Sequence, residues 1–136
     1  MISYEASVTI DKDKTIDNIA SMLSIVLKGF NFKSDTNDRF DEFPAFIATC
    51  DNAEFVLMSF PSDYESYGLE KEPDYFLLNF IFEIEEEKSK EYFECDFIKN
   101  LSTSTSCLTG FGQRDVSQEL ADYINKSGLI KCNISE

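Results

Sequence analysis

The chain has 136 residues and a formal net charge of −14 at pH 7, and 43% of its residues are hydrophobic, with 13 Phe and 6 Tyr among them. This apolar content excludes a wholly disordered acidic polypeptide, and the length suits a single domain spanning residues 1–136. Charge of this sign repels nucleic acid and anionic membranes and attracts basic protein surfaces. No stretch approaches the roughly 20 apolar residues that span a bilayer, and the N-terminal residues lack the basic and apolar regions of a secretion signal, so we expect a cytoplasmic protein.

The first predicted elements are a strand and a helix. Apolar and polar residues alternate from Ile2 to Ile10, which predicts a strand with one buried and one wet face. After a charged turn at 11–14, Thr15 is suited to cap a helix over residues 16–28, whose apolar side chains recur at helical spacing. Gly29 then provides a signal for the end of the helix.

A hairpin is predicted next. Phe30 and Phe32 have the alternation of a short strand, and a polar loop follows from Ser34 to Pro44. The β-rich runs 45–50 and 53–60 flank Asp51-Asn52, a pair of residues typical of hairpin turns.

The centre of the chain predicts one long strand between loops. Residues 62–74 contain Gly68 and Pro73 and predict a loop. Residues 75–85 are almost all apolar until the acidic end of the run, which predicts a central strand covered on both faces. Residues 89–101 fit either a helix or a strand. The helix is preferred because aromatic and apolar residues recur there at intervals of four.

The last third predicts a helix and a final strand. Residues 109–112 carry two glycines and indicate a turn before this helix. Asp115 and Gln118 resemble a capping box at its start, Gly128 ends it, and residues 129–134 form the expected last strand. The helix is identified by Val116, Leu120, Ala121, Tyr123 and Ile124.

This order of elements predicts an α+β fold. The first and last helices can lie side by side on one face of a mainly antiparallel sheet, which gives a two-layer sandwich with two or three helices.

Catalytic and metal-binding motifs are not found in the sequence. Without any His, the chain cannot form a Ser-His-Asp triad, a Cys-His dyad or an imidazole metal site. An enzyme that works with two carboxylates is the remaining alternative, but acids are so abundant here that no pair of them stands out. We therefore expect neither an enzyme nor a cofactor or metal. The Asp-rich segments 11–15 and 35–39 lack the glycine and the final glutamate of a calcium loop. The four cysteines are expected to be reduced packing residues or inert thiols: Cys50, Cys95, Cys107 and Cys132.

The negative charge is concentrated between residues 35 and 96. This span holds 18 acidic and four basic residues and so carries the whole net charge of −14, while the flanks are neutral. Tyrosines interleaved with acids at 63–75 resemble a recognition surface, because tyrosine offers rigid contact area and carboxylates pair with Arg and Lys. The predicted partner-binding residues are Asp38, Asp41, Glu42, Asp63, Tyr64, Glu65, Tyr67, Glu70, Glu72 and Asp74.

In size, acidity, α+β pattern and lack of catalytic groups, the chain resembles the immunity proteins of bacterial polymorphic toxins and of contact-dependent growth inhibition systems. The resemblance covers the character of the whole chain and no motif. It implies a protein that binds and neutralises a cognate toxin domain with a basic surface, for example a nuclease, either by filling its active site or by binding beside it. The alternative is resemblance to the type III secretion chaperones, which are likewise small and acidic. Chains of that family typically begin with a helix, whereas this one is predicted to begin with a strand.

Overall fold

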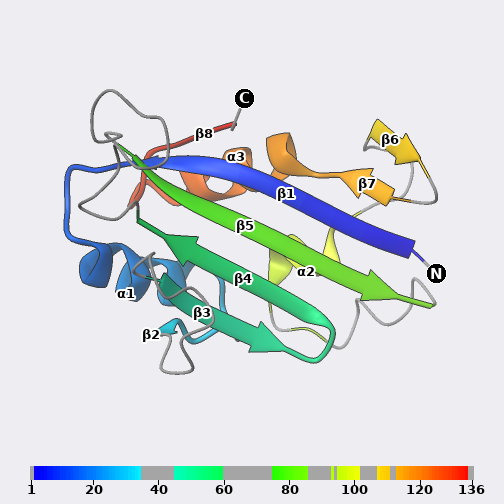
Figure 1. Cartoon of the computed structure of the whole chain (residues 1–136), viewed down its shortest axis with the longest axis horizontal. Coiled ribbons are helices and arrows are strands. Elements are labelled where there is room, and N and C mark those ends of the chain that lie inside the picture. Colours follow the sequence, from blue (N-terminus) through cyan, green and yellow to red (C-terminus); the bar gives the residue numbers. More distant parts are fainter. Residues whose placement is uncertain are drawn as a thin grey trace, which may run out of the picture.

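The computed structural model describes residues 2–34, 45–59, 75–85, 93, 95–101, 107–110 and 113–134; for Ile2, residues 107–110 and Gln113 it describes the backbone alone. Eight strands in this part of the chain form one sheet (Figure 1). They are β1 (Ile2–Asp11), β2 (Lys33–Ser34), β3 (Ala45–Cys50), β4 (Ala53–Met58), β5 (Tyr75–Ile84), β6 (Cys107–Gly110), β7 (Gln113–Asp115) and β8 (Cys132–Ile134). The helices are α1 (Ile16–Val26), α2 (Asp96–Lys99) and α3 (Ser117–Lys126).

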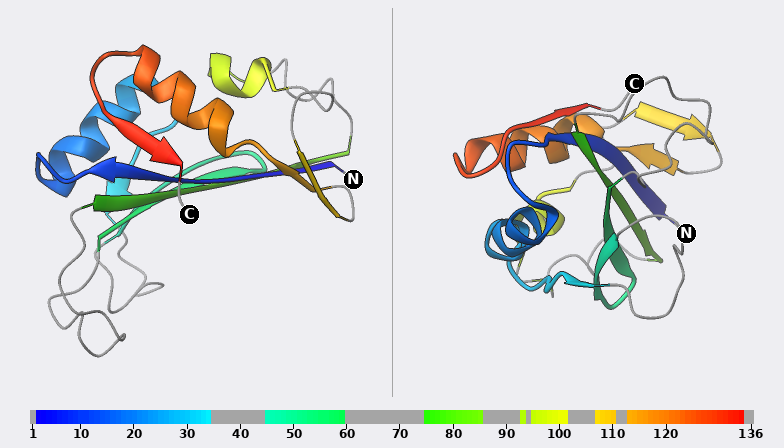
Figure 2. Two further views of the ribbon diagram at one scale, coloured as in Figure 1. Left: turned by 90° about the horizontal axis from the view of Figure 1, so that it is seen from above. Right: turned by 60° about the vertical axis from the view of Figure 1, so that its left-hand side comes forward.

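The sheet is mainly antiparallel, in the order β2-β3-β4-β5-β1-β7-β6. The exception is the parallel pair of β1 and β7. The three helices lie on one face of the sheet, and no described helix or strand lies on the other face (Figure 2). The predicted two-layer α+β sandwich is therefore confirmed.

The core between the two layers is built from aromatic side chains. Phe55 on β4 is fully buried, with its ring centroid 4.8 Å from that of Phe30 and 4.6 Å from that of Phe80. Phe97 of α2 joins the cluster at 5.4 Å from Phe80. Aromatic pairs at these distances add favourable ring contacts to the area that they bury.

One edge of β1 is shared by two short strands. Residues Ser3–Glu5 pair with β7 and residues Val8–Ile10 pair with β8, which leaves a gap between the two. In the gap the backbone N–H of Ser7 donates to Oγ of Ser117, at 3.0 Å. Ser117 Oγ donates in turn to Oδ1 of Asp115, at 2.6 Å. The side chain of Ser117, at the start of α3, thus provides the acceptor for the Ser7 amide, which lies in the gap between β7 and β8.

The first strand, the first helix and the hairpin are confirmed, with small differences in length. Thr15 caps α1 by accepting a hydrogen bond from the backbone N–H of Asn18, but the helix ends at Val26, two residues earlier than predicted. The hairpin turns at Asp51, which has a φ of 51°.

The short strand expected at Phe30 and Phe32 is wrong. The N–H of Phe30 donates to the carbonyl of Leu27, and the N–H of Phe32 donates to Oγ of Ser24. Because both backbone N–H groups donate to residues at the C-terminal end of α1, they are not available to a strand, and strand pairing begins only at Lys33.

The long strand β5 is central, but the prediction that it is covered on both faces is wrong. Its side chains alternate between buried and more exposed positions from Tyr75 to Ile84. The reason is that all three helices pack on one face of an antiparallel sheet, so only alternate residues of β5 face the core.

The helix preferred for residues 89–101 is confirmed over Asp96–Lys99, while residues 89–92 and 94 lie outside the described residues. Cys95 has extended backbone angles, and Phe93 is a buried residue outside any helix. In this segment the apolar spacing of four reflects burial against the sheet rather than a long helix.

The turn predicted at residues 109–112 is wrong at residues 109 and 110, which belong to a strand, while residues 111 and 112 lie outside the described residues. Residues 107–110 and 113–115 form β6 and β7, which pair with a register shift between Leu108 and Gly110. Such an irregularity, in strands of three or four residues, leaves no clear alternation in the sequence.

The predicted capping box of α3 is also wrong, because Val116 occupies the cap position without a side-chain hydrogen bond. Asp115 instead accepts the backbone N–H of Ser117. The last strand begins at Cys132 rather than at residue 129, because Ile130 turns into the core and the side chain of Asn125 bonds the backbone of Cys132.

Candidate protein-binding face

The ten residues predicted to bind a partner lie outside the described residues, in the segments 35–44 and 60–74. The predicted loops at those positions fall there as well. Of the 18 acidic residues between 35 and 96, five are described: Asp51, Glu54, Glu83, Glu85 and Asp96. The site is therefore built from these and from their neighbours in the sheet.

The face of the sheet away from the helices carries the site. Directly paired residues of neighbouring strands point to the same face, so the register of the sheet identifies the side chains that share it. On β1 and β5 the outward pairs include Ser3 with Glu83, and Glu5 with Ile81. On β4, Glu54 pairs with Ile81 from the other side. Hence Ile81 lies between two glutamates in one row across three strands.

Ile81 is exposed over 42% of its surface and is surrounded by carboxylates. Glu5 and Glu54 are its direct cross-strand neighbours, at a typical Cβ separation of about 5 Å. Glu83 follows it on β5, two residues along on the same face, and is diagonal to both glutamates, a relation that typically spans about 7–8 Å. We call the four residues Glu5, Glu54, Ile81 and Glu83 the Ile81 patch.

Charge on this face is of one sign around the patch. Among the described strand residues that face outward, the one base is Lys33 on β2, three strands away from β5. Asp115 on β7 pairs with Glu5 and extends the negative row to a fourth strand. The result is an exposed aliphatic side chain within a group of carboxylates.

The open area of this face has a definite limit. Tyr75, at the other end of β5, is 38% exposed, whereas Val56 of β4 is only 7% exposed although its register places it on the same face. Between the two ends, the hydroxyl of Ser7 donates to Oδ1 of Asn79 at 2.9 Å and locks β1 to β5. The exposed residues are thus at the two ends of β5: Tyr75, which pairs with Asp11, and Ile81, which lies between Glu5 and Glu54.

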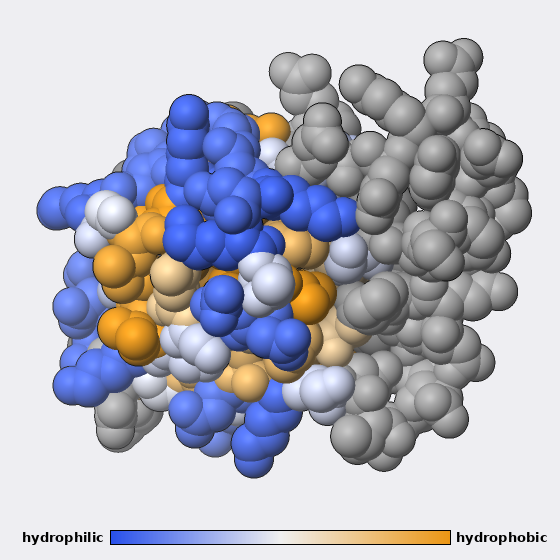
Figure 3. All heavy atoms as spheres, turned by 90° about the vertical axis from the view of Figure 1, so that its left-hand side faces the viewer, coloured by the Kyte–Doolittle hydropathy of each residue, from blue (hydrophilic) through white to orange (hydrophobic). Residues whose placement is uncertain are grey.

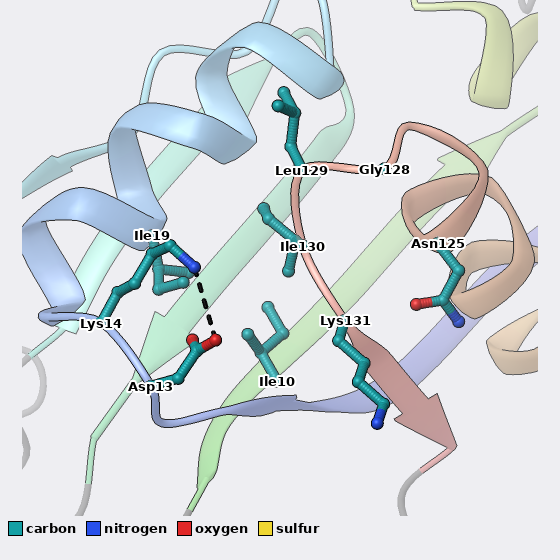
Figure 4. Close-up of a pocket in the computed structure, with 9 residues that line it drawn as sticks. All are labelled: Ile10, Asp13, Lys14, Ile19, Asn125, Gly128, Leu129, Ile130 and Lys131. Carbon is teal, nitrogen blue, oxygen red and sulfur yellow. Dashed lines mark hydrogen bonds and ion pairs between the residues drawn. The ribbon is translucent and has the colours of Figure 1, made fainter.

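A pocket of about 370 Å³ lies at the opposite end of β1, between the turn into α1 and the turn into β8 (Figure 4). Figure 3 views this end of the molecule, where hydrophobic and hydrophilic side chains are interleaved. Most of its polar side chains bond within the protein: Lys14 pairs with Asp13 at 3.4 Å, and the Asn125 side chain bonds both backbone groups of Cys132. Lys131 is the remaining charged residue in the lining, and a single lysine does not define a site.

The described residues contain no group of three or more His, Cys, Asp or Glu side chains able to hold a metal ion. Cys95 and Cys132 are buried thiols in the core, as predicted for packing residues, and Cys50 is partly buried. Burial raises the pKa of Cys132 to about 12 and raises the pKa of Cys95, which leaves both thiols protonated and unreactive at neutral pH. None of the helices in the described ranges is long and apolar enough to cross a membrane.

The Ile81 patch was missed at the sequence level, although part of its signal is present there. The alternation of β1 places Glu5 on the wet face, but the nearly continuous apolar run of β5 hides the fact that Ile81 is exposed. Bringing Glu54 beside Ile81 depends on the register of β4 with β5, which a single sequence does not specify.

Comparison with protein-family models, with curated proteins and with solved structures finds no match to this chain.

Proposed function

We propose that this protein is an acidic inhibitor of the immunity-protein type, which binds a basic toxin domain through the open face of its sheet. The observation that carries the proposal is the Ile81 patch, in which one exposed isoleucine is surrounded by three glutamates. Exposed apolar surface with a charged rim is typical of protein-binding sites.

The chemistry of the patch suits Arg and Lys side chains. The aliphatic stem of such a residue can pack on Ile81 while its charged end reaches a glutamate, so both parts of the side chain are bound. An arginine gains most, because its planar guanidinium forms two parallel hydrogen bonds with one carboxylate. Basic clefts that bind phosphates present residues of this kind.

The acidic middle of the chain supports the same function. Residues 35–96 carry the entire net charge of −14, and Glu54, Ile81 and Glu83 belong to this span. A concentrated field of this sign accelerates encounter with a basic partner, to about 10⁸ M⁻¹ s⁻¹ or faster at low salt. An inhibitor that must act before a toxin does harm benefits directly from fast association.

The proposal is tested by affinity capture from a lysate of the organism that encodes the chain, with washes at low and high salt and mass spectrometry of the bound proteins. We expect one basic protein at near-equal stoichiometry, whose isolated domain is toxic and is neutralised when the chain is co-expressed. Retention of an effector through a flexible segment, with no activity neutralised, would indicate the secretion chaperone instead. If nothing is retained even at low salt, the proposal fails.

The role of the patch is tested with two matched double variants. Glu5→Gln with Glu83→Gln removes two charges at the patch, and Asp13→Asn with Asp17→Asn removes two charges at the other end of β1. We expect the first variant to associate with the partner about tenfold more slowly at low ionic strength, and the second to stay within about twofold of the unaltered chain. Equal slowing by both variants would show that only the net charge matters.

A further inference from the structure

A groove in the helical layer carries a second inference. It lies between α2, with the residues that follow it, and α3, and has a volume of about 310 Å³. Because all three helices cover the inner face of the sheet, the groove is separated from the Ile81 patch by the sheet itself (Figure 2). Its lining consists of Asp96, Phe97, Asn100, Leu101, Glu119, Asp122, Tyr123 and Lys126.

The floor of the groove is apolar and fixed. Phe97 and Leu101 are almost completely buried, and the ring of Phe97 lies 5.7 Å from that of Tyr123 at an angle of 47°. The hydroxyl of Tyr123 donates to the backbone carbonyl of Val26 on α1, at 3.3 Å. Burial, with further contributions from Cys95 and Asp96, raises the pKa of Tyr123, so the phenol keeps the proton that it donates. The aromatic floor is therefore anchored to a second helix.

The rim of the groove is negative. Asp96 projects from α2, and Glu119 and Asp122 from α3, while Lys126 at one end is the single base in the lining. The side-chain amide of Gln118 donates to Oδ1 of Asp122 at 2.9 Å and orients this carboxylate. Three carboxylates above an aromatic and aliphatic floor form a site for a cation with an apolar stem, not for a neutral or anionic group.

We propose that this groove binds an arginine side chain presented by a basic protein segment. A guanidinium can stack on the ring of Tyr123 while it donates hydrogen bonds to Asp122 or Glu119, and its methylene stem can cover Phe97. Arginine fits better than lysine because a planar group can stack on a ring and bind a carboxylate together, whereas an ammonium is a compact and strongly hydrated charge. This inference does not depend on the proposed inhibitor function, since it concerns a different surface and its test needs no natural partner.

The test is a titration of the ¹⁵N-labelled chain followed by NMR, with Nα-acetyl-arginine N-methylamide as the probe. The matched probe is the citrulline compound, which has the same shape but no charge. We expect saturable shifts centred on the amides of Phe97, Asn100 and Tyr123, with a dissociation constant in the millimolar range for arginine and binding at least about fivefold weaker for citrulline. Equal binding of the two probes, or shifts spread over the whole surface, would overturn the proposal.

Variants separate the groove from the general charge of the chain. Glu119→Gln with Asp122→Asn should weaken arginine binding at least about fivefold. The fold should persist, because Asp122 is exposed, Glu119 is partly exposed, and neither belongs to the buried face of α3. Asp13→Asn with Asp17→Asn, which changes the net charge equally, should leave the dissociation constant within about twofold. If both variants weaken binding alike, the probe senses only the overall charge and the groove is not a site.

Discussion

The hydrogen bond that closes the gap on the edge of β1 gives a sharp stability prediction. Ser117→Ala removes the oxygen that accepts the Ser7 N–H at 3.0 Å. A buried donor left without an acceptor costs roughly 1–3 kcal/mol, and Ser7 is only partly buried, so we expect a loss of about 1–2 kcal/mol in the free energy of unfolding. Asp115 contributes little to this loss, because it is exposed and keeps the backbone N–H of Ser117.

The assay is urea unfolding, together with hydrogen exchange of the Ser7 amide. With a denaturant dependence of about 2 kcal/mol/M, the unfolding midpoint should fall by about 0.5–1 M, and exchange at Ser7 should accelerate more than at its neighbours in β1. Ser21→Ala is the matched control, because Ser21 Oγ makes an exposed bond within α1; its effect should stay under about 0.5 kcal/mol. If Ser117→Ala unfolds at the same midpoint as the unaltered chain and the Ser7 amide stays protected from exchange, a group other than Ser117 Oγ accepts the hydrogen bond of the Ser7 N–H, and the prediction is wrong.

Three further predictions concern the core, the thiols and the hairpin. Phe55→Ala should lower the free energy of unfolding by about 3–5 kcal/mol, because the ring is fully buried and packs against Phe30 and Phe80. Tyr75→Ala on the open face should lower it by less than about 1 kcal/mol. Equal melting temperatures for the two variants would contradict the assigned core. Because the pKa of Cys132 is raised to about 12, the folded thiol stays protonated at pH values where the unfolded one ionises, so the free energy of unfolding should fall as pH rises from about 9 to about 12. Urea titrations of Cys132→Ala should show a smaller fall over this pH range. An identical pH dependence in both proteins would refute the role of burial. Asp51 has a φ of 51°, so Asp51→Gly should be neutral or stabilising while Asp51→Val should cost about 1–2 kcal/mol in the same urea assay, and a tolerated valine would contradict the left-handed turn.

The parts of the fold that the sequence predicts are those with long local patterns. The alternation of β1, the helical spacing and Thr15 cap of α1, and the Asp51-Asn52 turn each depend on residues close together in the chain, and each is confirmed. They also suffice for the fold class, because antiparallel strands with two amphipathic helices have few ways to bury their apolar faces.

The parts that the sequence does not predict are decided by contacts between distant residues. β7 has three residues, and one of the two strands that it pairs with is β1, about 110 positions earlier in the chain. The exposure of Ile81 depends on all three helices packing against the other face of the sheet, and nothing within the run 75–85 indicates which face that is. The same limit applies to the Ile81 patch, since Glu5, Glu54 and Glu83 meet only through the register of three strands.

The most direct test of a binding function at the Ile81 patch compares two exposed isoleucines in one capture experiment. Ile81→Asn alters the patch on β5, while Ile25→Asn alters an isolated isoleucine, 71% exposed, on α1 in the helical layer. The proposal predicts that the unaltered chain and Ile25→Asn retain the same basic protein in equal amounts, and that Ile81→Asn loses most of it although it remains folded. Equal retention by all three proteins would contradict the account, because the open face around Ile81 would then not be the surface that binds.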